Sequence, residues 1–411
     1  MDKKLITKLG RLSHPIQSFA LDADQKDLLS LKEILKGARI VALGEASHGT
    51  REHFQFKNRV IRFLMEEMGF RYFMIEASQW ECKNIEDYVL MGKGNKYEAL
   101  ESQRFWTWRT EEVMELIDWM RAHNLSCPRG KEVHFLGFDM QIMPNILKYL
   151  ETLGQFLPAR DKKRLNNLLE RTGIQKRTIS EPRQVADAYW LHGWVNEKQY
   201  FLREKLGFQV AKLMEEASRT LVQYELMTVA KDPNAPRDYA MSQNITDFVN
   251  ALDPSEKVIL WAHDGHIGKR YFWENVGYWL SERYGSQYYA LGFGLWGGQF
   301  QSRLCDLDNK IYGELMVHDI PPFPDYCWEN DLRKINKQDY YIDLRSNLGD
   351  SEIKAWAEQT KPMIMLDEGW DPGKGVTHYE APFVLSEVFD GMVFTHHTHS
   401  AIGIPPSKEA K

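Results

Sequence analysis

The chain of 411 residues lacks several features that would place a protein in a class at once. Its four cysteines are widely spaced and form no C-x-x-C pair, which argues against a zinc knuckle or a dithiol redox motif. No stretch approaches the ~18–20 consecutive apolar residues of a membrane span. The N-terminal segment MDKKLITKLGRLSHPIQSFALD has no apolar run long enough for a signal peptide. We therefore expect a cytoplasmic protein without a membrane segment.

An excess of basic charge is also missing, because 52 Lys and Arg stand against 58 Asp and Glu. Non-specific nucleic-acid binders are normally basic, so we expect a small-molecule partner and no nucleic acid. The chain contains no G-x-S-x-G, H-E-x-x-H, G-x-G-x-x-G or P-loop motif. A serine hydrolase of the α/β-hydrolase kind, a zincin and the usual nucleotide-binding folds are therefore unsupported.

Aromatic residues, in contrast, make up 12% of the chain and include 13 tryptophans. They belong either to the core or to the wall of a pocket for a bulky, partly apolar ligand. The length is ample for a large hydrophobic core, in one large α/β domain with an insertion or in two to three domains.

Short apolar runs recur along the chain and predict buried parallel strands, because they are rich in β-branched and aromatic residues. Helical patterns separate them. Val60, Ile61, Leu64 and Met68, for example, fall on one helical face, and Gly69 is where that helix would stop; Thr110 would cap a second helix over Glu111–His123. This alternation predicts an α/β fold with a largely parallel sheet flanked by helices. The strand-like runs are Arg39–Leu43, Tyr72–Ile75, Val133–Phe138, Val258–Ala262, Tyr288–Phe293, Tyr340–Leu344, Met363–Leu366 and Met392–Thr395.

Residues 146–250 differ from the rest, since they consist of long, charged, helix-prone stretches with almost no strand signal. Helices are predicted over Arg160–Glu170, Gln184–Glu204, Val210–Val229 and Asp238–Asn250. We interpret them as a helical insertion, or lid, over an active-site cleft. Residues 1–145 and 251–411 would then form a discontinuous α/β catalytic core. The alternative is a separate helical domain joined by linkers.

Ionisable side chains follow four of the predicted strands at their carboxyl ends, where open parallel sheets bind their ligands. Together they would form a convergent polar cluster that fits an active site. These residues are Glu45, His48, Glu76, Asp139, His263 and His266.

Taken singly, each of these residues has a simpler interpretation. The G-E-x-x-H spacing of Glu45 and His48 arises often by chance, and His48 could cap the next helix. The H-x-x-H pair of His263 and His266 could be an ordinary loop pair or half of a metal site. Asp139 could do no more than orient a neighbour.

Five motifs in order resemble the erythromycin esterase family: V-A-L-G-E-A-S-H-G-T-R-E-H-F, F-M-I-E-A, F-L-G-F-D, R-D-Y-A-M-S-Q-N-I and V-I-L-W-A-H-D-G-H-I-G-K. The resemblance extends to the C-terminal S-E-V-F-D-G-M-V-F-T. It implies an α/β core with a helical region over a deep cleft. It also implies hydrolysis of macrolide lactone rings by a His general base, with no cofactor and no required metal.

Carried over to this chain, the resemblance makes His48 the base that activates water. Glu45 and Glu76 would orient that water or fix the tautomer of His48. His263 would stabilise the developing oxyanion or assist the leaving alkoxide, with His266 beside it.

Further residues are predicted to contact the substrate. Lys57 falls where certain macrolide esterases carry an Arg in the cleft, and Arg51 lies on the same predicted helix. Both could equally be solvated helix charges. Trp106, Trp108 and Arg109 follow a predicted loop and could wall the cleft, although the tryptophans could equally belong to the core.

One departure from the family pattern concerns specificity. Macrolide esterases usually have a bulky residue after the first-motif His, whereas this chain has S-H-G-T-R-E. That form resembles the broader family, including members described as succinoglycan-biosynthesis proteins. The first hypothesis is therefore an esterase that cleaves a lactone or other ester. Specificity for macrolides is a narrower form of the same hypothesis. A metal-dependent hydrolase and a non-catalytic haem or ligand carrier are the alternatives.

Overall fold

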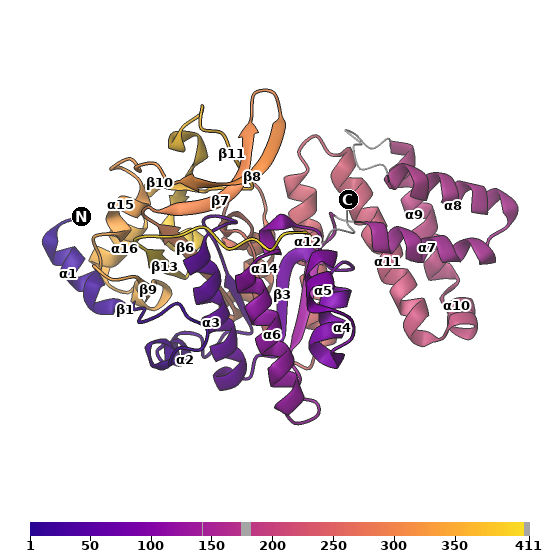
Figure 1. The fold of residues 1–411 in the computed structure, drawn as a ribbon, viewed down its shortest axis with the longest axis horizontal. Helices are drawn as coiled ribbons and strands as arrows, with labels where there is room; N and C mark the ends of the chain where they lie inside the picture. Colours follow the sequence, from indigo (N-terminus) through magenta and orange to yellow (C-terminus); the bar gives the residue numbers. More distant parts are fainter. Residues whose placement is uncertain (142, 174–181, 407–411) are drawn as a thin grey trace.

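A computed structural model describes residues 1–141, 143–173 and 182–406. An eight-stranded sheet in the order β1-β9-β13-β6-β2-β5-β3-β4 forms its centre (Figure 1). The strands from β13 to β4 pair in parallel, and β9 and β1 add an antiparallel edge. The predicted α/β class with a largely parallel sheet is confirmed. In sheet order the strands are β1 (Ser13–Pro15), β9 (Tyr340–Asp343), β13 (Gly391–Thr395), β6 (Tyr288–Leu295), β2 (Ile40–Leu43), β5 (Val258–Trp261), β3 (Tyr72–Ser78) and β4 (His134–Asp139).

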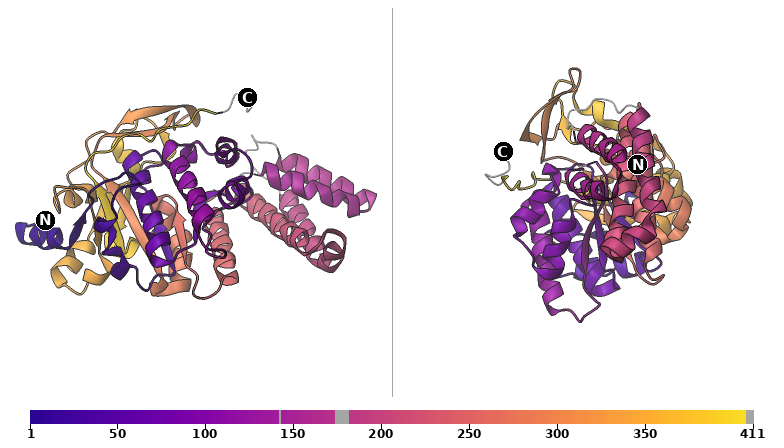
Figure 2. Two further views of the ribbon diagram at one scale, coloured as in Figure 1. Left: turned by 60° about the horizontal axis from the view of Figure 1, so that its bottom comes forward. Right: turned by 90° about the vertical axis from the view of Figure 1, so that its right-hand side faces the viewer.

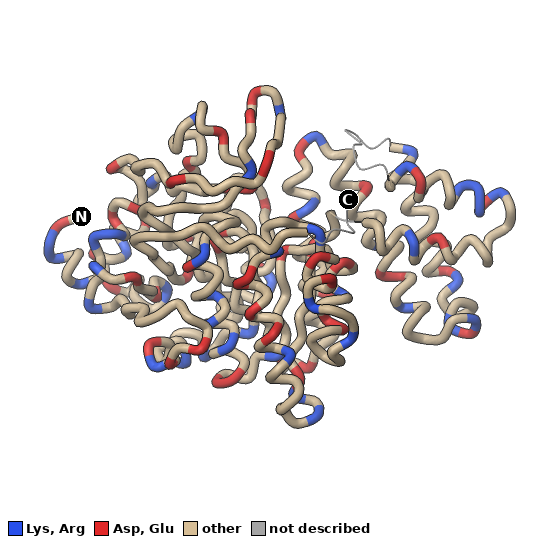
Figure 3. The backbone as a smooth tube through the Cα atoms, viewed as in Figure 1, with Lys and Arg blue, Asp and Glu red and all other residues tan. Residues whose placement is uncertain are grey.

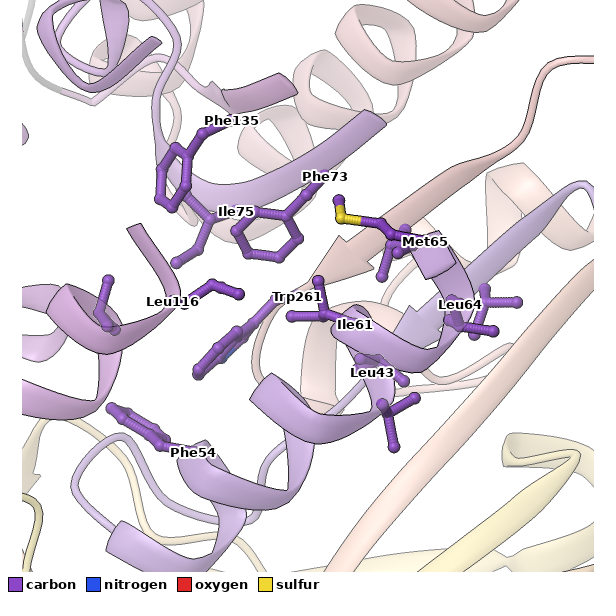
Figure 4. Close-up of a cluster of buried hydrophobic side chains, with 14 of the residues drawn as sticks. Leu43, Phe54, Ile61, Leu64, Met65, Phe73, Ile75, Leu116, Phe135 and Trp261 are labelled. Carbon is purple, nitrogen blue, oxygen red and sulfur yellow. The ribbon is translucent and has the colours of Figure 1, made fainter. Parts of the chain in front are cut away.

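Helices cover both faces of this sheet, because successive side chains of a buried strand point to opposite sides. In β2, Val41 and Leu43 join one hydrophobic cluster, and Ile40 and Ala42 join another. Figure 4 shows part of the first cluster, where Trp261 lies among side chains of the sheet and its helices. That face carries α2 (Leu31–Ile34), α3 (Arg51–Met68), α4 (Lys83–Met91), α5 (Lys96–Ser102) and α6 (Glu111–Ser126). The other carries α1 (Lys3–Leu12), α12 (Asn234–Ala251), α13 (Asp264–Ile267), α14 (Val276–Tyr284), α15 (Trp328–Leu332), α16 (Ser351–Ala357) and α17 (Leu385–Val388).

Two helices, α3 and α6, each have one end where the sequence predicts it. α3 stops at Gly69, whose φ of 72° lies in the left-handed region that glycine adopts without strain. Thr110 caps α6 by accepting a hydrogen bond from the backbone N–H of Val113.

Most of the helix-prone interval, from α7 to α11, folds into a bundle with its own hydrophobic cluster, projecting from one end of the α/β body (Figures 1 and 2). Its last helix, α12, packs against the central sheet instead. The predicted helix over Gln184–Glu204 is divided at Lys198 into two helices. Residues 174–181 of this interval lie outside the described residues, and the division into core and insertion stays a prediction. The helices are α7 (Pro144–Glu151), α8 (Ala159–Thr172), α9 (Pro182–Glu197), α10 (Gln199–Leu206) and α11 (Phe208–Val229).

Two smaller sheets lie beside the loop after β2. Their contact is direct, because the backbone N–H of Gln301, in one of these strands, donates to the carbonyl of Gly49 at 3.0 Å, and that of Leu366 donates to the carbonyl of Ala46. The strand expected at Met363–Leu366 overlaps the end of β10, which pairs with β12 outside the central sheet. These strands are β7 (Gln299–Asp306), β8 (Ile311–Asp319), β10 (Thr360–Ile364), β11 (Gly369–Trp370) and β12 (Glu380–Val384).

Within the described part of the chain, no helix combines the length and apolar character needed to cross a bilayer. Figure 3 shows basic and acidic residues interspersed over the α/β body and the helical bundle.

Candidate active site

A cleft of about 650 Å³ lies at the carboxyl ends of β2, β5 and β3. These strands are neighbours at the centre of the sheet, where α/β folds bind ligands. The volume suits a bulky small molecule. His48, Glu76, His263 and His266 all line it, and Phe105, Tyr271, Phe272 and Tyr312 give parts of its wall an aromatic character.

The loop after β2 builds the first part of the site. His48 donates a hydrogen bond from Nδ1 to Oε1 of Glu45 at 2.7 Å. The other oxygen of Glu45 accepts from the indole N–H of Trp261 at 2.8 Å and from the ammonium of Lys57. Glu45 is fully buried, so its charge needs these partners. Gly44 permits the tight packing, since a Cβ there would lie 1.7 Å from a carboxylate oxygen of Asp264.

His48 is held in the charged form by the carboxylates around it. Burial by itself would lower its pKa, but the hydrogen bonds and charges of Asp367 and Glu45 raise that pKa well above 6.5. Oδ1 of Asp367 lies 3.5 Å from Nε2 of His48. Burial opposes the ionisation of Glu45, yet the charges of Lys57 and His48 keep its pKa below 4.5.

His263 has the opposite character. Burial, and then the charge of His48, lowers the pKa of His263 to about 4, so this imidazole is neutral at pH 7. Its Nδ1 accepts the backbone N–H of Gly265 at 3.3 Å, which assigns the remaining proton to Nε2. That buried Nε2 has no hydrogen-bond partner among the described residues. An unpaired buried donor is costly, so its presence beside a cleft favours a role toward a ligand.

Glu76 occupies an irregular part of β3. The pairing of β3 with β4 shifts register between Ile75 and Ser78, and strand irregularities of this kind re-aim side chains beside active sites. The strand thus continues past the expected end at Ile75. One oxygen of Glu76 accepts the backbone N–H of His263 at 2.9 Å, and the other accepts from Arg237 at 2.7 Å.

A network of charges surrounds Glu76. Arg237, in the first turns of α12, also donates to Asp139 at 2.8 Å. Burial would raise the pKa of Glu76, but His266 and Arg237 hold it well below 4.5. His266 donates to Asp238 at 2.6 Å and lies 3.2 Å from Glu76. Against the effect of burial, these two carboxylates raise the pKa of His266 to about 10.

The structure brings together all six ionisable residues of the predicted cluster. Asp139 is fully buried and binds Arg237, and it is absent from the described lining of the cleft. The remaining five comprise Glu45 beneath His48 and four residues that line the cleft.

Of the predicted substrate contacts outside the ionisable cluster, one lines the cleft and four do not. Trp108 lines the cleft and donates its indole N–H to the carbonyl of Glu76 at 3.0 Å. Arg51, Lys57, Trp106 and Arg109 are absent from the described lining.

The positions of three of these residues have a physical reason. Lys57 shares a face of α3 with Phe54 and Ile61, so it points toward the sheet, fully buried and 4.0 Å from the ring of Trp261. Arg51 lies at the start of α3, 3.7 Å from Glu112. Arg109 donates from Nε to the carbonyl of Ile404.

Sequence reasoning missed Arg237, Asp238 and Asp367. Asp367 directly follows a predicted strand, so the rule that selected the other acids would also have selected it. Arg237 and Asp238 start a predicted helix, so the strand-end rule does not select them. Their place at the start of the R-D-Y-A-M-S-Q-N-I motif is the signal that could have found them.

The arrangement offers acid–base chemistry and hydrogen bonding. In the described ranges, no group of three or more His, Cys, Asp or Glu side chains is arranged to hold a metal ion. The alternating charges, with His48 cationic beside neutral His263, instead suit proton transfer and stabilisation of a developing negative charge.

Comparison with known proteins gives consistent matches. The family model "Erythromycin esterase" matches residues 65–398. The putative hydrolase YbfO of Bacillus subtilis is 24% identical over 92% of this chain and 88% of its own. Erythromycin esterase type II of Escherichia coli is 23% identical over 74% of this chain and 78% of its own.

Among solved structures, a Bacillus cereus protein superposes with a TM-score of 0.82 at 23% identity, covering 98% of this chain and all of that one. A mutant of the erythromycin esterase EreC in its open conformation superposes with a TM-score of 0.68 at 16% identity, covering 94% of this chain and 98% of that one.

Proposed function

The chain belongs to the erythromycin esterase family, and on that premise we propose that it is an esterase that hydrolyses a lactone or other carboxylic ester, including the macrolactone ring of macrolides. Family membership supports the broader assignment to hydrolases. The observation that carries the finer proposal is the pair His48 and His263, whose rings lie 4.9 Å apart on the cleft wall and whose pKa values are shifted in opposite directions by their different partners.

In the proposed reaction, His48 acts after losing the proton on Nε2. It takes a proton from water as the water oxygen bonds to the ester carbonyl carbon. The Nε2–H of His263 donates to the carbonyl oxygen, which becomes an oxyanion. The ester C–O bond then breaks, and the proton on His48 passes to the leaving alkoxide. The ester and one water are thus converted to one carboxylic acid and one alcohol, and His48 and His263 end with the protons they had at the start.

The other residues of the site maintain these two states. Glu45 fixes the Nδ1–H tautomer of His48, and Lys57 and Trp261 hold Glu45 in place. Glu76 fixes the backbone of His263, while Arg237 and His266 balance its charge. The aromatic wall supports a bulky, partly apolar substrate.

The test is mass spectrometry of the protein incubated with macrolides of different ring sizes and a panel of simpler esters. A gain of one water on a substrate, lost in the His48→Ala variant, is the expected result. Absence of turnover on every ester contradicts the proposal. Treatment with a chelator accompanies each reaction, since loss of activity would favour the metal-dependent hydrolase.

A further inference from the structure

Asp367 reaches the site from the C-terminal part of the chain and is fixed there by the backbone. Leu366 donates its N–H to the carbonyl of Ala46 at 2.8 Å, and Ser47 and Leu366 form a parallel bridge. The segment that carries Asp367 therefore runs directly beside the loop that carries His48. This contact is independent of the central sheet.

The carboxylate of Asp367 faces the reacting nitrogen of His48. Its Oδ1 accepts the backbone N–H of Glu368 at 2.8 Å and lies 3.5 Å from Nε2 of His48. The side chain lines the cleft and is 67% exposed. An imidazole that has a carboxylate at each nitrogen is favoured with a proton on both. These two carboxylates therefore favour a proton on Nε2, whereas the proposed reaction needs Nε2 without its proton.

The groups that surround His48 differ in what they can control. Glu45 faces Nδ1, is buried and is neutralised by Lys57, so it sets orientation. Glu76 acts through its charge and is itself paired with Arg237 and His266. His263 is neutral, and Glu368 has a longer-range electrostatic interaction with His48. Among the described groups, Asp367 is the carboxylate next to Nε2.

We propose that Asp367 is a positioning residue for the hydrolysis, because it holds the Nε2–H of His48 and thereby sets the pH range in which His48 can accept a proton from water. The effect of Asp367 on hydrolysis rests on the proposed function. The contact between Asp367 and His48 can be tested without it.

The first test is the titration of His48 by NMR in the wild type, Asp367→Asn and Asp367→Glu. In Asp367→Asn the midpoint should move toward lower pH, and in Asp367→Glu it should stay near the wild-type midpoint. The matched control is Glu368→Gln, which removes a neighbouring carboxylate of the same cleft and should shift the midpoint less. Circular dichroism and thermal unfolding establish that each variant is folded.

The second test is the pH dependence of kcat/KM on an ester that the wild type hydrolyses. The acid limb of Asp367→Asn should move to lower pH. At a pH well below the wild-type midpoint, each protein is compared by its activity as a fraction of its own plateau. A midpoint lowered by one pH unit makes this fraction about tenfold larger in the variant than in the wild type.

Two results would overturn the inference. One is a His48 midpoint in folded Asp367→Asn that coincides with the wild type. The other is an equal shift in Glu368→Gln, which would show a general charge effect and no specific contact. A shifted NMR midpoint without hydrolysis of any ester would support the contact and contradict the proposed function, so the two failures can be told apart.

Discussion

The loops after β2 and β5 place two histidines side by side, yet the two rings carry different charges. His48 has carboxylates near both nitrogens and is cationic, whereas His263 accepts a backbone N–H and is neutral. Both are buried to a similar degree. The difference shows that burial alone does not set the protonation state of a histidine; the hydrogen-bond partners of each nitrogen decide it.

The strongest way to break this comparison is to remove the base. His48→Asn should lower kcat by about 10²–10⁴-fold, the contribution typical of a general base. Activity is measured on the esters identified by mass spectrometry. His134→Asn is the matched control, since His134 also binds a glutamate through Nδ1 at 2.7 Å but starts β4, at the opposite end of the sheet. If His48→Asn keeps activity near that of the wild type, His48 is not the general base.

Removal of the neutral partner tests the other half of the comparison. His263→Ala should lower kcat by about 10²–10³-fold, the loss typical for one oxyanion donor. Because His263 stays neutral above its pKa of about 4, the acid limb of the pH profile, which His48 sets, should keep its midpoint. Kinetics between about pH 5 and 9 check both expectations. A displaced limb would indicate that His263 is itself the titrating base.

Glu45→Gln should make His48 more like His263. Loss of this buried carboxylate lowers the pKa of His48 toward 6.5, which NMR titration measures. The same change leaves Lys57 buried without its counter-charge and should reduce the free energy of unfolding by about 3–5 kcal/mol. Urea denaturation measures that loss. The matched control Glu86→Gln removes the glutamate of the His134 pair, which is partly exposed, and should cost less. Equal losses in the two variants would show that Lys57 does not depend on Glu45.

The smallest expected effect concerns His266, the third histidine of the cleft. Its folded-state pKa of about 10 exceeds the ordinary value of 6.5. Its contribution to stability is therefore full below pH 6.5 and declines as the pH rises toward 10. In His266→Gln, this decline in the free energy of unfolding should become shallower. Urea unfolding at several pH values between about 7 and 9 tests it, and an identical slope in both proteins would contradict it.

Much of the fold could be predicted from local patterns. Apolar runs such as Val258–Ala262 mark strands, and Gly69 and Thr110 mark helix ends, because these signals depend on residues close in sequence. The end of β3 could not be predicted, because its irregular pairing with β4 forms only in the sheet. Lys57, a predicted substrate contact, lies beneath Glu45. Its spacing from Ile61 and Leu64 already places it on the apolar face of α3, but only the packed structure supplies Glu45 as the partner that a buried lysine needs.

By itself, the sequence determined the α/β class and the loops at whose strand ends Glu45, His48, Glu76, His263 and His266 meet. It could do so because parallel strands place their carboxyl ends at one edge of the sheet. Only the tertiary structure decided the charge of each group, since the partners that set it come from distant parts of the chain: Asp367 at His48, and Arg237 and Asp238 from α12 at Glu76 and His266. Electrostatic interactions depend on distance in space and on burial, and neither can be read from separation along the chain.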